Sequence, residues 1–277
     1  MKLSLIATVI ITLGSLGASH QAQAGGRDLV ICMPGSPGSS AGAKAYMAPF
    51  FRRIESLAGW PAATLNGSFH PSYSGCMSQI RSSRPGFAVV SLGVYLEQRR
   101  RFKMRVLGRV DILYGAGSRL YLVVKKGSYA SLAQLKGKRL TSDHLEESKF
   151  LSKVMFGGKI DVTKHFKLKK VRAATKGMRD VKRGRADATI INDEQLRIMK
   201  RRGYPLVVLH KSPPLPGAPL VALGRYARSG DVKKMKKVAG AMCSGALGRS
   251  LCRKTGIKSA RRATDSTYAR MVRLFGK

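Results

Sequence analysis

Short apolar runs and longer segments with apolar residues at helical spacing alternate along the chain. The short runs, bounded by Gly, Pro, Ser or charged residues, predict strands, and the longer segments predict helices. The expected strands cover residues 28–33, 62–69, 87–92, 104–110, 120–125, 138–142, 166–171, 188–191 and 206–209. The expected helices cover residues 39–58, 72–84, 95–101, 131–135, 146–156, 175–184, 193–202, 231–246 and 266–275. This alternation predicts an α/β fold with mainly parallel sheets.

The alternating elements fall into two blocks, which predicts two lobes joined by two crossings of the chain. The crossings are expected near residues 114–119 and 211–223, the second of which begins with a proline-rich stretch that cannot be a regular element. We therefore expect lobe 1 to comprise residues 25–116 together with 218–277, and lobe 2 to comprise residues 117–217. The final helices are expected to return to lobe 1.

The first residues have the layout of a secretory signal peptide, which we assign to residues 1–24. Lys2 gives a positive start, residues 3–18 are almost entirely apolar, and Ala22 and Ala24 form a small-x-small cleavage site. The apolar run is shorter than the roughly 20 residues that a spanning helix needs. A retained N-terminal anchor is the alternative. The mature chain is expected to be soluble, exported and periplasmic.

The chain is strongly basic, with 52 Lys and Arg against 14 Asp and Glu and a net charge of +38. A field of this size attracts anions and acidic surfaces. Nucleic acid is not the expected partner, because the chain is exported, its basic residues are spread evenly, and its aromatic content is 7% without basic-aromatic interleaving. Anionic envelope polymers, anionic lipid headgroups or an acidic external medium explain this charge equally well.

The four cysteines lack the close pairs of a zinc site, and an oxidising compartment favours disulfides. Three pairings are open. The short loop between Cys243 and Cys252 favours that pair, which leaves Cys32 with Cys76. Four free, buried thiols are the alternative.

Several motifs, taken in order, carry a resemblance to a known family. They are a first strand that ends in a Pro/Gly/Ser loop, then Ser72-Tyr73, FAVVSLGVYL (87–96), SLAQLKGKRL (131–140), VKRGRADATIIND (181–193) and SPPLPGAPLVALGR (212–225). This series resembles the substrate-binding protein of an ABC transporter with the two-lobed type II periplasmic fold. Within that fold it is most similar to the phosphate/phosphite/phosphonate-binding branch.

The resemblance implies an exported solute-binding protein that is not an enzyme and needs no cofactor. Its two lobes would close by a hinge on a small ligand, with anions as one candidate class, and deliver it to an ABC permease or a sensor. A monomer is usual for this family. The alternative is a basic envelope-interaction protein that kept the fold and binds anionic polymers or lipids instead of a transported solute.

Candidate ligand-binding residues follow from the places where strands end and helices begin in such a fold. They are Ser36, Ser39, Ser40, Tyr73, Ser74, Ser91, Ser142, Asp143, His144, Ser148 and Asp193. Ser39 and Ser74 could instead cap or begin helices, and Asp193 could cap the helix that follows it.

The stretch around Asp143 is unusually acidic for this chain. Where the resembled family carries a Ser/Thr-rich, Gly-containing turn, this chain has SDHLEES (142–148), whose carboxylates would repel a phosphonate. Three interpretations are open. The stretch could be a helix start in which Glu146 and Glu147 favour the helix dipole, a ligand site for a cation or hydroxyls, or a metal site using His144 and Glu147.

Several motifs typical of enzymes are absent from the sequence. There is no P-loop, no HExxH and no dinucleotide-binding fingerprint. The sequence thus favours a binding protein over an enzyme.

Overall fold

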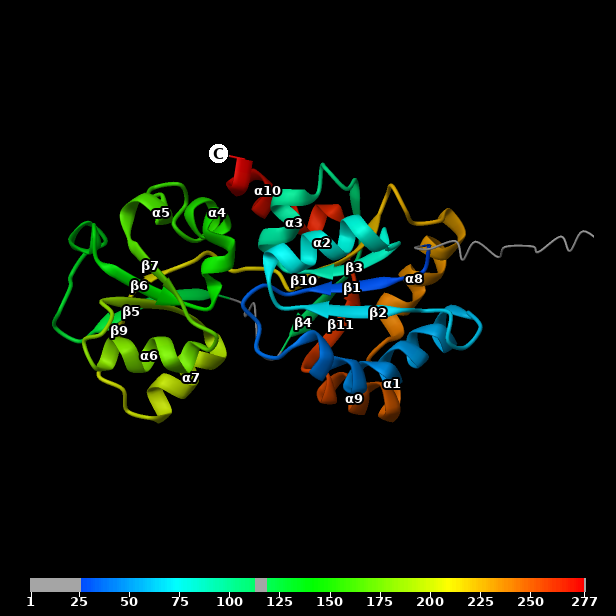
Figure 1. Cartoon of the computed structure of the whole chain (residues 1–277), viewed down its shortest axis with the longest axis horizontal. Helices are drawn as coiled ribbons and strands as arrows, with labels where there is room; N and C mark the ends of the chain where they lie inside the picture. The colour runs from blue at the N-terminus through cyan, green and yellow to red at the C-terminus, as the bar shows by residue number, and fades with distance from the viewer. Residues whose placement is uncertain (1–25, 113–118, 277) are drawn as a thin grey trace, which may run out of the picture.

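The computed structural model describes residues 26–112 and 119–276. The expected signal peptide and most of the first expected crossing lie outside the described residues. Two lobes lie side by side, each built on its own β-sheet, and both cover their sheets with helices (Figure 1). The chain passes from one sheet to the other between β4 and β5, and returns between β9 and β10.

Lobe 1 is defined here by a six-stranded sheet in the order β11-β4-β10-β3-β1-β2 and by the helices that pack on it. Its strands are β1 (Leu29–Cys32), β2 (Gly67–His70), β3 (Phe87–Val90), β4 (Met104–Ile112), β10 (Ala218–Leu223) and β11 (Ile257–Arg262). Its helices are α1 (Ser40–Ala58), α2 (Tyr73–Ser83), α3 (Leu92–Gln98), α8 (Ser229–Ala241), α9 (Gly245–Lys254), the 3-10 turn η4 (Asp265–Tyr268) and α10 (Ala269–Gly276).

Lobe 2 is defined by a five-stranded sheet in the order β7-β6-β8-β5-β9 and its helices. The strands are β5 (Leu120–Lys125), β6 (Arg139–Ser142), β7 (Lys167–Lys170), β8 (Ala188–Asn192) and β9 (Leu206–Lys211). The helical segments are η1 (Ala133–Leu135), η2 (His144–Glu147), α4 (Ser148–Phe150), η3 (Leu151–Met155), α5 (Val162–His165), α6 (Ala174–Lys182) and α7 (Asp193–Arg201).

Each sheet has the expected parallel core, and antiparallel strands extend it. The parallel pairs are β1–β2, β1–β3, β6–β7 and β6–β8. Strands β10, β11, β5 and β9 pair antiparallel with their neighbours. The two-lobed α/β fold is therefore confirmed. In the parallel cores, the carboxyl ends of β1, β3, β6 and β8 point to the region between the lobes, where this kind of fold binds ligands.

The C-terminal part departs from the sequence prediction. The helix expected over residues 231–246 is α8, which ends at Ala241, and the helix α9 that follows was not predicted. The strand β10, which lies inside the expected crossing, and the strand β11 were not predicted either. The sequence of β11, IKSARR, lacks the apolar alternation of a strand because it lies at the sheet edge and is mostly solvent-accessible. The helix expected over residues 146–156 is instead a 3-10 turn, a single α-turn and a π-helix in succession.

Local sequence signals explain several element boundaries. Helix α7 begins with a full capping box, in which the Asn192 side chain accepts from the Gln195 N–H and the Gln195 side chain accepts from the Asn192 N–H. Helix α1 is closed by Gly59, whose φ of 60° is in the left-handed region that glycine adopts at little cost. The edge strand β7 reads KLKK, its four residues are solvent-exposed, and its lysines oppose pairing with a further strand.

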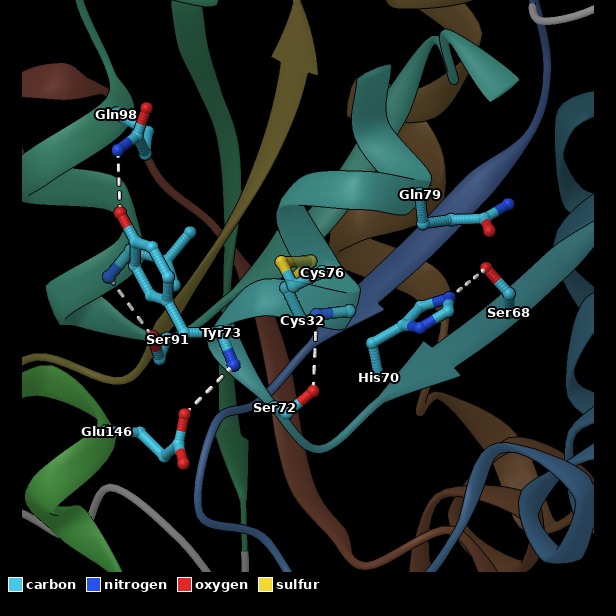
Figure 2. Close-up of a disulfide and its surroundings, with 12 residues drawn as sticks. Cys32, Ser68, His70, Ser72, Tyr73, Cys76, Gln79, Ser91, Gln98 and Glu146 are labelled. Atoms are coloured by element: carbon cyan, nitrogen blue, oxygen red, sulfur yellow. Dashed lines mark hydrogen bonds between the residues drawn. A yellow bond between two sulfur atoms is a disulfide. The ribbon is translucent and has the colours of Figure 1, made fainter. Parts of the chain in front are cut away.

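Both predicted disulfides are present. Cys243 pairs with Cys252 across a separation of 9 residues, and Cys32 pairs with Cys76 across 44 residues. The second bond ties the carboxyl end of β1 to the first turn of α2, which lies at the inner edge of lobe 1 (Figure 2). Within the residues that the structure describes, no helix has the length and apolar character needed to cross a membrane.

Candidate functional site

A cavity of about 200 Å³ lies between the two lobes. Lobe 1 contributes the loop 33–37 after β1 and the residues 91–93 that follow β3. Lobe 2 contributes residues after β6, the first residues of α6, and residues at the start of α7. We call this cavity the cleft. It lies at the carboxyl ends of strands from both sheets, as the topology requires for a ligand site of this fold.

Glu147 of lobe 2 reaches across the cleft to the amino end of α3 in lobe 1. Its Oε1 accepts a short hydrogen bond from the Ser91 hydroxyl and a second one from the Val94 N–H at 2.9 Å. Ser91 is also the N-cap of α3, because its Oγ accepts from the same N–H at 3.2 Å. A carboxylate at a helix amino end is favoured by the free N–H groups and the helix dipole. Glu147 therefore fills a position suited to an anion.

The surroundings of Glu147 leave no room for a larger residue at Gly93. A Cβ placed on Gly93 would lie 2.4 Å from Glu147 Oε1 and 3.0 Å from the Cβ of Phe150. Burial raises the pKa of Glu147 to about 7, and the hydrogen bonds from Ser91 and Val94 oppose that rise. The nearby carboxylates of Glu97 and Glu146 raise the pKa further. Glu147 thus carries a proton for part of the time near neutral pH.

Glu146 makes a second contact between the lobes. Its Oε2 accepts from the N–H of Tyr73 at 3.3 Å, at the amino end of α2, and its Oε1 lies 2.9 Å from the Lys170 Nζ. Figure 2 shows the Glu146 carboxylate pointing at the Tyr73 backbone, while the Tyr73 hydroxyl accepts from the Gln98 amide. Two adjacent glutamates of lobe 2 therefore accept hydrogen bonds from backbone N–H groups at two helix amino ends of lobe 1.

Asp143 and His144 line the cleft next to this contact. The Asp143 side chain is 8% exposed, and its Oδ1 lies 3.3 Å from Ser142 Oγ and 3.8 Å from His144 Nε2, the latter beyond hydrogen-bond distance. The His144 Nε2 is buried and has no hydrogen-bond partner among the described residues. Across the cleft, Gly35 lies so close that a Cβ there would meet the Asp143 carbonyl oxygen at 2.1 Å. Only glycine fits at this contact between the lobes.

Two helix amino ends of lobe 2 also face the cleft. Helix α6 begins after Ala173, whose side chain cannot cap it, and Ala174 and Thr175 of its first turn line the cavity. Asn192 and Gln195 of the α7 capping box line it as well, together with Glu194, which is ion-paired with Arg197. The first turn of α6 is thus placed to donate to an acceptor group.

Of the residues predicted from the sequence, four line the cleft, namely Ser36, Ser91, Asp143 and His144. Ser39 caps α1 by accepting from the Gly42 N–H at 3.1 Å, and it lines a different cavity. The side chain of Ser40 is outside the described residues. Tyr73 contacts the Glu146 carboxylate through its N–H and Gln98 through its hydroxyl, and Ser74 is exposed on α2.

Three further predicted residues hold the fold of lobe 2 and do not line the cleft. Ser142 is fully buried, donating to the Ile190 carbonyl at 3.0 Å and accepting from the His144 N–H at 3.1 Å. The Ser148 carbonyl accepts a hydrogen bond from the Ser152 hydroxyl, and both residues line another cavity of the structure. Asp193 accepts from the Arg119 N–H and from the Tyr121 hydroxyl, at 3.0 Å and 2.6 Å.

Sequence reasoning missed the role of Glu147 and the cleft positions of Thr175, Asn192, Glu194 and Gln195. The pattern Asn192-x-x-Gln195 is a helix-start signal that could have located the second helix amino end. Nothing in the sequence indicates that Glu147 crosses to Ser91, because the two residues are 56 positions apart.

The three interpretations of the acidic stretch can now be compared with the geometry. Asp143 occupies the N-cap position of η2, but its side chain makes no capping hydrogen bond. Glu146 and Glu147 do favour helix dipoles, but those of α2 and α3 in the other lobe. Within the described part of the chain, no three His, Cys, Asp or Glu side chains are grouped so that they could hold a metal ion.

A second, apolar cavity of about 500 Å³ lies inside lobe 1, between α1 and the carboxyl ends of the strands. It shares Met33, Ser36 and Pro37 with the cleft. It is larger than the cleft, but it belongs to one lobe and contains no carboxylate among the described residues that line it. The cleft, with polar groups from both lobes, is therefore the candidate site.

The fold and the cleft together define a two-lobed binding protein, and comparisons with known proteins give its family. Residues 38–268, which are 231 of the 277, match the family model described as ABC transporter, phosphonate, periplasmic substrate-binding protein. The chain belongs to this family of periplasmic solute-binding proteins, which work with ABC permeases and are not enzymes. The resemblance stated from the sequence is confirmed. Comparison with curated proteins returns no match.

Solved structures share the fold at low sequence identity. A binding-protein component of an ABC phosphonate transporter from Pseudomonas aeruginosa has a TM-score of 0.66 and 18% identity, over 91% of this chain and 85% of that one. A Xanthomonas citri protein bound to ATP has a TM-score of 0.67 and 16% identity, over 90% of this chain and 96% of that one. PhnD1 from Prochlorococcus marinus, in complex with methylphosphonate, has a TM-score of 0.63 and 16% identity, over 90% of this chain and 97% of that one.

Proposed function

We propose that this chain captures its solute in the cleft between the two lobes and presents it to an ABC permease. The observation that carries the proposal is the convergence of both lobes on one cavity at the carboxyl ends of β1, β3, β6 and β8. The helix amino ends of α3 in lobe 1 and of α6 and α7 in lobe 2 face this same space. A ligand there would contact both lobes and so stabilise their closed arrangement.

The fold does not fix the ligand. The similar structures from Xanthomonas citri and Prochlorococcus marinus hold ATP and methylphosphonate, which differ greatly in size. In this chain the amino end of α3 is occupied by Glu147, and the family's hydroxyl-rich turn is replaced by residues 142–148. The ligand class must therefore come from the cleft of this chain itself.

A thermal-shift screen with two tryptophan variants tests the proposed site. Thr175→Trp places a large side chain in the cleft from the second position of α6, where Thr175 is partly buried. Ser74→Trp is the matched control, since Ser74 occupies the second position of α2 and is exposed. A bound solute stabilises by RT ln(1 + [L]/Kd), so it raises the melting temperature of the wild type and of Ser74→Trp.

The same solute should leave Thr175→Trp unshifted. An equal shift of Thr175→Trp would place the ligand elsewhere and end the proposal.

Three further points remain predictions. They are export through a signal peptide over residues 1–24, the monomeric state, and binding of anionic polymers or lipids by the basic exterior. Salt-dependent sedimentation with anionic vesicles would test the last of these.

A further inference from the structure

The cleft differs sharply in charge from the rest of the chain. Twenty-one residues line it, and none of these described residues is Lys or Arg, whereas Lys and Arg make up 52 of the 277 residues of the sequence. At that frequency about four of the lining positions would be basic. The lining instead contains Asp143, Glu147 and Glu194, in a chain with only 14 acidic residues.

From this contrast we infer that the solute is a small organic cation, whose amine or guanidinium group is received by Asp143 and Glu147. The inference rests on the proposed function and names its ligand class. Asp143 is 8% exposed, so a charge bound to its free carboxylate oxygen is largely removed from solvent. A buried carboxylate gains most from a partner of opposite charge that also donates hydrogen bonds.

An anionic ligand meets the opposite situation. The amino end of α3, which suits an anion, is taken by the Glu147 carboxylate held by Ser91 and Val94. A phosphonate in the remaining space would face Asp143 and Glu147 at close range, without a lysine or arginine among the described lining residues to balance it. Glu194 repels an anion less than Asp143 does, because its carboxylate is paired with Arg197.

When a cationic group binds Asp143 and Glu147, the other polar groups of the cleft can still contact the same ligand. The first turn of α6, which starts at Ala174 without a side-chain cap, can donate to a carbonyl or carboxylate elsewhere on the same ligand. The buried Nε2 of His144, which has no partner among the described residues, can accept from an ammonium or guanidinium hydrogen when the ring is neutral. A ligand with a cationic group and an acceptor group therefore satisfies both sides of the cleft.

Matched probe pairs test the charge of the ligand directly. Calorimetric titration and thermal shift are run with arginine against citrulline and with methylguanidine against methylurea, where each pair differs chiefly in the positive charge. Lysine, agmatine, putrescine and choline widen the cationic arm, and methylphosphonate and phosphate form the anionic arm. We expect at least one cation to bind at least tenfold more tightly than its neutral analogue or than either anion.

Variants locate the charge recognition. Asp143→Asn should weaken the binding of that cation at least tenfold, whereas Asp161→Asn, an exposed acid at the start of α5, makes the same change of net charge and should leave the affinity unaltered. Should Asp143→Asn fail to fold, Glu147→Gln measured at pH 8 takes its place, again with a loss of affinity.

The outcomes separate this inference from the proposed function. If methylphosphonate or phosphate binds more tightly than every cation, and Thr175→Trp abolishes that binding, the cleft is the site but the cation inference is wrong. If no cation exceeds its neutral analogue, the inference also fails. If solutes shift Thr175→Trp as much as the wild type, the proposed site itself is wrong.

Discussion

Replacing Glu147 by Gln should make the protein more stable at alkaline pH. The Gln Oε1 can accept the same hydrogen bonds from Ser91 and Val94, so the change removes the charge and keeps the contact. In the folded protein the pKa of Glu147 is about 7, against an ordinary value of 4.5, chiefly because of burial. Ionisation of Glu147 therefore lowers the free energy of unfolding, whereas the neutral glutamine of the variant causes no such decrease.

The sign and size of the effect follow from proton linkage. Because the folded pKa is raised, the contribution of Glu147 is fully present below pH 4.5 and is lost as the pH rises through about 7. One pKa unit corresponds to about 1.4 kcal/mol, so the loss is up to about 3 kcal/mol, reduced by the partial solvent access of the side chain. The groups that act on Glu147 are Glu97, Glu146 and the Tyr73 hydroxyl.

Urea unfolding of the wild type and Glu147→Gln at half-unit steps from pH 4 to pH 8.5 measures the effect. The difference in unfolding free energy cancels the other titrating groups. It should rise in favour of the variant between pH 4.5 and pH 7 and then level off. Asp161→Asn is a control in which the difference in unfolding free energy should change with pH in the opposite direction, since hydrogen bonds from Thr163 lower the pKa of Asp161. A pH-independent difference for Glu147→Gln, or one that favours the wild type as the pH rises, would refute the reasoning.

Three further changes test the packing around the site. Gly93→Ala should lower the melting temperature by displacing Glu147, at a cost of about 1–3 kcal/mol, while Gly230→Ala, with no atom near its Cβ, should be neutral or stabilising. Asp193→Asn should cost about 1–3 kcal/mol in urea unfolding, because two donors lose a charged acceptor; an unchanged midpoint would contradict this. Replacing Cys32 and Cys76 together by Ser should cost about 4 kcal/mol from the entropy of the loop they close, also measured in urea, and a loss below about 1 kcal/mol would show that the bond does not constrain the chain.

The architecture could be predicted because its signals are local. Apolar runs such as that of β3 and helical spacing such as that of α1 depend on neighbouring residues, and the order of the motifs identified the family. The edge strand β11 could not be predicted, since its polar sequence has no buried face to reveal it. The pairing of Cys243 with Cys252 was accessible because the separation is short.

The site could be predicted only in part, because it is assembled from residues far apart in the sequence. The ends of strands pointed to Ser36, Ser91, Asp143 and His144, which do line the cleft. Ser142, by contrast, faces the β8 backbone, and a hydroxyl at a strand end gives no sign of the side on which it will hydrogen-bond. The role of Glu147 depends on how the two lobes approach, which no local pattern records.

Hydrogen–deuterium exchange with a solute that raises the melting temperature tests the central claim, that the ligand is held between the lobes. We predict added protection of backbone amides in both lobes at once, over residues 91–98 of lobe 1 and over residues 143–150 and 174–177 of lobe 2. Protection confined to one lobe, or to the basic helix α8 outside the cleft, would contradict the account.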